Sequence, residues 1–257
     1  MCSTYSTDVL FITSFLASIT CPEEQDIEAI KKVIVYLHNT AGKKQYFFRT
    51  GPIKLILFGD ASHNSFANAT GQQCEIIYGD ENSAALDMSS VKEKEVTHSS
   101  YESELVVQNK LSQKGIKMHE MLTELSVDVP LPMIMYSDNE AAVTTASQEH
   151  INKMGRSKFM NRKLFYLHNQ VVAGMIKPTW IATAENDADI GTKPLMGSLY
   201  DYLSNRQFSR MYCEPFLTVT PKDSKFVGRK VGGSSKSSEA SDDDDEDMTV
   251  RNSSKGK

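Results

Sequence analysis

The sequence has few cysteines and lacks an apolar run long enough to cross a bilayer as a helix. The spacing of its four cysteines fits neither a zinc site nor a dense disulfide framework, so we expect free thiols in a reducing compartment. These cysteines are Cys2, Cys21, Cys74 and Cys213. The apolar segment 9–17 has the length of a signal peptide, but no lysine or arginine precedes it. We therefore expect an intracellular protein without a membrane contact.

An excess of positive charge is also missing. The formal net charge is -5, so the whole chain does not have the basic character of a general nucleic-acid binder. Contact with nucleic acid would have to come from a local patch. With 257 residues, the chain is long enough for one domain with appendages.

Two short apolar runs end in an acid. Residues 55–58 precede Asp60, and residues 133–136 precede Asp138, which a helix-type sequence follows. In an open α/β sheet, ligands bind at the carboxyl edge of the strands, so Asp60 and Asp138 are candidates for a site. A second interpretation is that Asp138 only caps the following helix.

The remaining pattern alternates between helices and strands and predicts an α/β fold. Two helices are expected within 8–40, and the second, over 26–38, has an apolar stripe that we expect to pack against the next domain. A hairpin with a four-residue loop at 79–82 and a long helix from 99 to 125 follow. The last expected elements are a helix at 140–148, a basic helix, a strand at 175–181, a turn at 186–195 and a helix at 199–208.

Four acids on separate elements could converge at one edge of the sheet: Asp60, Glu104, Asp138 and Asp189. Residues two apart on a helix point in different directions, so at most one of Glu102 and Glu104 belongs to a common site. Gathered carboxylates repel one another unless a cation lies between them, and oxygen ligands favour Mg²⁺ or Mn²⁺. Two such ions can promote hydrolysis of a phosphodiester.

Five bases fall within eleven positions that contain no acid: Lys153, Arg156, Lys158, Arg162 and Lys163. Apolar residues interrupt them, as in an amphipathic helix. Two interpretations are open, a solvated helix face and a stripe that contacts phosphates.

Four motifs in this order resemble the ribonuclease H domain of copia-type LTR retrotransposon Pol polyproteins. They are Gly59-Asp60-Ala61-Ser62, Ser99 to Leu105, Tyr136 to Ala142 and Ala188 to Leu195. The resemblance covers residues 8–209. It implies a five-stranded mixed sheet flanked by helices, and hydrolysis of the RNA strand of RNA/DNA hybrids with two Mg²⁺ ions, for which Mn²⁺ can substitute.

The same resemblance implies that Asp60, Glu104, Asp138 and Asp189 are the metal-binding catalytic acids. Glu104 is chosen over Glu102 because it directly precedes the apolar start of the helix body. Asp189 is chosen over Asp187 because it occupies the Ala-Asp-Ile position. The histidine usual near the basic segment of this family is missing, and the nearest candidate is His168.

We expect three regions: a helical remnant of the reverse transcriptase connection at 1–50, a ribonuclease H-like domain at 51–212 and a disordered Ser/acidic tail at 213–257. The expected partners are an RNA/DNA hybrid and a reverse transcriptase domain in cis or in trans. The expected location is the cytoplasm, in a virus-like particle, or the nucleus. Two alternatives to the enzyme stay open: a catalytically inactive or domesticated binding module, and an accessory to a polymerase in another chain.

Overall fold

The computed structural model describes residues 6–47, 51–63, 71–95, 97–148 and 158–208. The chain divides into two compact units, Met1–Leu217 and Thr218–Lys257, and the described residues all belong to the first. The expected tail at 213–257 lies outside the described residues, as do Lys153 and Arg156. The region boundaries given above stay predictions.

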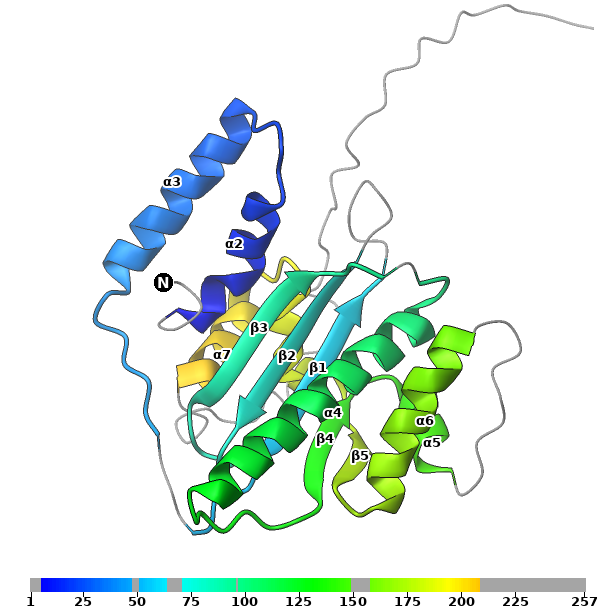
Figure 1. Ribbon diagram of the computed structural model, residues 1–257. Helices are drawn as coiled ribbons and strands as arrows, with labels where there is room; N and C mark the ends of the chain where they lie inside the picture. Colours follow the sequence, from blue (N-terminus) through cyan, green and yellow to red (C-terminus); the bar gives the residue numbers. More distant parts are fainter. Residues whose placement is uncertain (1–5, 48–50, 64–70, 96, 149–157, 209–257) are drawn as a thin grey trace, which may run out of the picture. The chain divides into compact units, whose positions relative to one another are not determined.

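Five strands form one mixed sheet in the order β3-β2-β1-β4-β5 (Figure 1). They are β1 (Ile56–Ser62), β2 (Gln72–Tyr78), β3 (Ala85–Lys92), β4 (Met133–Ser137) and β5 (Ile176–Trp180). Strand β2 runs antiparallel to both β1 and β3, whereas β4 runs parallel to both β1 and β5. The predicted five-stranded mixed sheet with flanking helices is confirmed.

The longest described helix, α4, runs from Ser100 to Glu124 and begins where the Ser99 side chain accepts a hydrogen bond from the Glu102 backbone amide. This is the N-cap that a serine provides. The other helices are η1 (Thr7–Val9), α2 (Leu10–Ala17), α3 (Glu24–Asn39), α5 (Glu140–Ser147), α6 (Lys158–Val172), η2 (Thr183–Glu185), η3 (Asp187–Gly191) and α7 (Gly197–Phe208). None of the helices in the described ranges is long and apolar enough to cross a membrane.

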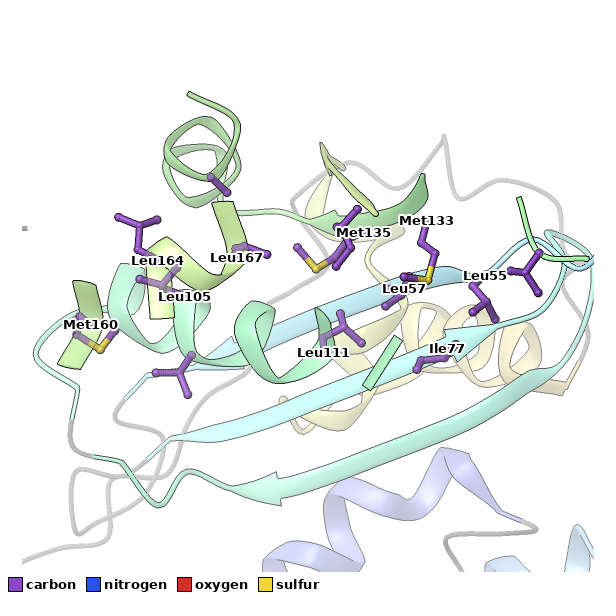
Figure 2. Close-up of a cluster of buried hydrophobic side chains, with 14 residues drawn as sticks. Leu55, Leu57, Ile77, Leu105, Leu111, Met133, Met135, Met160, Leu164 and Leu167 are labelled. Carbon is purple, nitrogen blue, oxygen red and sulfur yellow. The ribbon is translucent and has the colours of Figure 1, made fainter. Parts of the chain in front are cut away.

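The two faces of the sheet bury separate apolar clusters, because successive side chains of a strand point to opposite faces. Leu57 packs with Leu105 and Leu111 of α4 and with residues of α6 (Figure 2). Phe58 faces the other way and packs with residues of α2, η3 and α7. Helix α4 approaches β1 so closely that a Cβ at Gly115 would lie 2.4 Å from Leu57 Cδ2. The sheet is thus held between two layers.

Several boundaries differ from the predictions. Strand β1 continues past Asp60 to Ser62 instead of ending at the acid, since Ala61 and Ser62 also pair with β2. The hairpin loop covers 79–84 and is longer than the predicted four residues. Leu125 lies beyond the end of α4 and is 67% exposed.

The predicted packing of the second helix is wrong within the described residues. Helix α3 has no buried residue, and its apolar stripe is open: Ile27 is 49%, Ile30 43% and Ile34 59% exposed. Of the described cysteines, Cys21 is exposed and Cys74 is buried, and both are free thiols.

Candidate metal centre at the sheet edge

Asp60 and Asp138 lie side by side because β1 and β4 are parallel neighbours. Phe58 pairs with Tyr136 in this register. Two residues further along the chain, Asp60 lies in β1 and Asp138 directly follows β4, and their carboxylates come together at the carboxyl edge. This is the edge where an open α/β sheet binds ligands.

The capping interpretation of Asp138 is wrong. The N-cap of α5 is Asn139, whose Oδ1 accepts a hydrogen bond from the Ala142 amide at 3.0 Å. Asp and Asn are both good caps, so sequence alone could not separate the two neighbours. With Asn139 in that position, the Asp138 carboxylate belongs to the cluster at the sheet edge.

Asp189 reaches the same edge from the turn η3, which Asn186 ties to β1. Asn186 Nδ2 donates a hydrogen bond to the Gly59 carbonyl oxygen at 3.3 Å. Asp187 is fully buried and pairs with Arg206, with 2.8 Å between Arg206 Nε and Asp187 Oδ1. Asp187 is thereby engaged with α7, and Asp189 contributes to the cluster instead.

The three aspartates form a compact set of oxygen ligands. One carboxylate oxygen each from Asp60, Asp138 and Asp189 lies within 4.8 Å of the other two. Asp60 and Asp189 are buried, and Asp138 is half-buried. Such a donor set suits a hard divalent cation.

Glu104 stands next to this set but is not one of its members. Its Oε1 accepts a hydrogen bond from the Ala61 amide at 3.1 Å, and its Oε2 accepts one from Ser137 Oγ at 3.4 Å. The carboxylate is therefore fixed between the residues that adjoin Asp60 and Asp138. Glu102, by contrast, accepts a hydrogen bond from the His98 amide at 2.7 Å and belongs to the start of α4.

Burial makes the ionised cluster costly. Burial first, and then the charge of Asp60, raise the pKa of Glu104 and of Asp189 well above the usual range. The pKa of Asp60 is also raised, mainly by burial, although Lys193 opposes this shift. A bound cation would offset both the burial and the mutual repulsion.

Two neighbours of this cluster were not predicted as site residues. Lys193 Nζ lies 2.7 Å from Asp189 Oδ1 and 3.7 Å from Asp60 Oδ2. The Thr192 hydroxyl donates a hydrogen bond to Asp60 Oδ2. The spacing of four between Asp189 and Lys193 is the signal that could have identified the lysine, because such residues are neighbours on a helical turn.

The described part of the predicted basic stripe lies on α6. Lys158 and Arg162 are exposed. Lys163 has another role, since its Nζ is 3.1 Å from Glu95 Oε2 and 4.6 Å from the centre of the Phe159 ring. Among the described residues of the predicted stripe, two exposed bases therefore remain that can contact phosphates.

The strand order, with an aspartate cluster across the central parallel pair, is that of a ribonuclease H-like fold. No family model matches the chain. Among curated proteins, it is 24% identical over 189 residues to the Retrovirus-related Pol polyprotein from transposon RE1 of Arabidopsis thaliana. The aligned region covers 72% of this chain and 12% of that protein. It is also 24% identical over 211 residues to the Transposon Ty1-ER2 Gag-Pol polyprotein of Saccharomyces cerevisiae, or 77% of this chain and 11% of that protein.

The predicted resemblance to retrotransposon Pol polyproteins is thus confirmed, and the chain spans about an eighth of the length of these relatives.

Solved structures with a similar chain trace include an N-terminal RNase H domain from Mycobacterium tuberculosis. The TM-score is 0.39 and the identity 16%, and the match covers 60% of this chain and 98% of that one. LC11-RNase H1, isolated from compost, has a TM-score of 0.42, 16% identity and coverage of 54% and 92%. The fold assignment rests on the strand order and register described above.

Proposed function

We propose that this protein hydrolyses the RNA strand of RNA/DNA hybrids endonucleolytically, with two divalent metal ions, as the ribonuclease H portion of a retrotransposon polyprotein. The observation that carries the proposal is the set of three aspartate oxygens within 4.8 Å of one another at the carboxyl edge of β1 and β4. The similarity to retrotransposon Pol polyproteins supports the same activity.

The residues present fit Mg²⁺, with Mn²⁺ as a substitute. All donors are carboxylate oxygens, and the raised pKa values of Asp60 and Asp189 indicate a cluster that a cation would stabilise. Asp60, Asp138 and Asp189 would hold the ions, with Glu104 as the fourth ligand. Bound divalent ions make water a stronger nucleophile and neutralise the negative charge of a phosphodiester.

The role of the chain itself is to fix these oxygens before the substrate arrives. The Ala61 amide and the Ser137 hydroxyl hold the Glu104 carboxylate, and the Thr192 hydroxyl holds that of Asp60. These contacts connect β1, β4, α4 and the residue that follows η3. Preorganised ligands avoid the cost of reorganisation during the reaction.

Substrate contacts are proposed for the bases of α6 and its preceding segment. Lys158 and Arg162 are exposed and can approach phosphate oxygens. Recognition of the RNA strand would depend on the 2′-hydroxyl groups in the minor groove of the hybrid. Cleavage should therefore require a hybrid and spare a DNA duplex.

The test is cleavage of end-labelled substrates by the purified chain. We expect cuts in the RNA strand of a hybrid in Mg²⁺ or Mn²⁺, none in EDTA and none in a DNA duplex of the same sequence. A protein that binds the hybrid and leaves it intact with both metals would refute the catalytic function. That outcome would favour the inactive or domesticated binding module.

We also propose that a reverse transcriptase domain, in cis or in trans, covers the open stripe of α3. Ile27, Ile34 and the adjacent Val35 are about half exposed or more, which is unusual for aliphatic residues at helical spacing. The region 1–50 would then belong to the polymerase connection and 51–212 to the nuclease. Adding the polymerase part in trans should increase hybrid cleavage, and no gain would count against this arrangement.

A further inference from the structure

The ammonium group of Lys193 forms ion pairs with two of the three clustered aspartates. Its Nζ is 2.7 Å from Asp189 Oδ1 and 3.7 Å from Asp60 Oδ2, and both carboxylates are 3% exposed. The lysine side chain itself is 36% exposed. The ammonium group therefore bridges two buried anions, while part of the side chain is open to solvent.

The lysine and a divalent ion would use the same oxygens. Three ionised aspartates carry three negative charges, and the ammonium group offsets one of them. Two cations that share a carboxylate repel each other, and the repulsion is strong where water is excluded. The ammonium group has a route away from the cluster, because the lysine side chain is 36% exposed and its four-carbon stem is flexible.

We propose that Lys193 is an internal counter-cation of the cluster, a positioning residue that holds Asp60 and Asp189 together without metal and leaves them when a divalent ion binds. This inference rests on the metal site of the proposed function. It gives Lys193 two effects of opposite sign: the residue stabilises the metal-free fold and weakens the binding of the metal. A purely structural lysine would have only the first effect.

The first test measures Mg²⁺ affinity by titration calorimetry on the full chain. Lys193→Met should bind Mg²⁺ at least about tenfold more tightly than the wild type, because the competing charge is gone. Lys193→Arg keeps the charge and should bind much as the wild type does. Unchanged or weaker binding by Lys193→Met would overturn the proposal.

Lys43 provides the matched control. Its Nζ lies 3.2 Å from the buried carboxylate of Asp8 and 2.9 Å from Ser204 Oγ, in contacts away from the aspartate cluster. Lys43→Met removes a comparable ion pair and should lower the melting temperature. Its Mg²⁺ affinity should equal that of the wild type, and a rise equal to that of Lys193→Met would contradict a specific role for Lys193.

The second test uses the wild type alone, so it still tests whether Lys193 leaves the aspartates if Lys193→Met does not fold. The wild type is treated with an amine-acetylating reagent, and the modification of each lysine is followed by mass spectrometry in EDTA and in Mg²⁺. Modification of Lys193 should increase severalfold with Mg²⁺, while that of Lys43 stays constant. A constant or lower reactivity of Lys193 would overturn the proposal.

Neither test depends on cleavage, so the two proposals can fail separately. A protein that binds Mg²⁺ and leaves hybrids intact refutes the proposed function and leaves the role of Lys193 standing. A protein that cleaves hybrids and shows no gain in Mg²⁺ affinity in Lys193→Met refutes only the role of the lysine. A wild type that binds no Mg²⁺ refutes the role of Lys193, because no competing ion is then bound.

Discussion

The hydroxyl of Thr192 donates a hydrogen bond to the carboxylate of Asp60, although the two residues are 132 positions apart in the chain. Together with the contact between Asn186 and the Gly59 carbonyl, it ties η3 to the central strand. Asp189 reaches the cluster only because of this docking. The geometry of the candidate site therefore depends on residues that bind no ion themselves.

Asp138→Asn tests the catalytic role of the cluster. The change removes one negative charge and keeps the shape of the side chain, so hybrid cleavage should fall by about 100-fold or more, as expected for the loss of several kcal/mol of charge stabilisation. The melting temperature in EDTA should stay the same or rise, because repulsion between carboxylates is relieved. Glu140→Gln, at an exposed acid two residues away, should leave cleavage unchanged. Equal losses in both variants would contradict a specific role for Asp138.

Glu104→Gln tests the electrostatics through pH. Burial, followed by the charge of Asp60, raises the pKa of Glu104 well above its ordinary value of 4.5. The folded state therefore binds this proton more tightly than the unfolded state, and the ionisation of Glu104 destabilises the fold as pH rises above that value. Gln cannot ionise, so the variant should gain stability relative to the wild type between about pH 5 and pH 8, by about 1.4 kcal/mol for each unit of pKa separation.

The measurement is the free energy of unfolding in urea, with EDTA present, at both pH values. Glu102→Gln is the control, since Glu102 accepts its hydrogen bond from the His98 amide, at the start of α4. We expect no such gain with pH in the control. A stability difference between Glu104→Gln and the wild type that is the same at both pH values would show that burial of this charge is not costly.

Gly191→Ala tests the packing of η3 on the sheet. A Cβ at this position would lie 2.3 Å from the Cys74 sulfur and 2.8 Å from its Cβ, so the backbone has to shift. Overpacking of this kind costs about 1 to 3 kcal/mol of stability. Denaturant unfolding should show this loss, and a double-mutant cycle with Cys74→Ala should recover part of it. Gly42→Ala, where nothing lies within 4 Å, should be close to neutral.

Arg162→Ala tests the contact with phosphates. Arg162 is exposed on α6, and its loss should weaken binding to a hybrid and reduce the slope of log affinity against log salt concentration by about 1. Fluorescence anisotropy over a series of salt concentrations measures both quantities. Lys31→Ala, at an exposed base of α3 that pairs with Glu28, should change neither. An unchanged slope for Arg162→Ala would favour the interpretation of α6 as a solvated face.

Much of the architecture could be predicted because apolar periodicity is a local property. The runs around Leu57 and Met135 indicated buried strands, and the acids that follow them indicated a site at the strand ends. The extension of β1 beyond Asp60 could not be predicted, since it depends on pairing with β2, where Gln73 and Gln72 lie opposite Ala61 and Ser62. The open stripe of α3 was also missed, because an amphipathic pattern shows that a face is apolar and not what covers it.

The late position of Asp189 in the chain has a consequence for biosynthesis. A growing polypeptide leaves the ribosome from its N-terminus, and β1, α4 and β4 can pair before η3 has been made. Until the segment around Asp189 and Lys193 emerges and docks on β1, Asp60 and Asp138 lie together without the third aspartate and without the lysine. An unfinished chain would therefore have the sheet without its complete cluster, and under the proposed function it could not cut nucleic acid during its own translation.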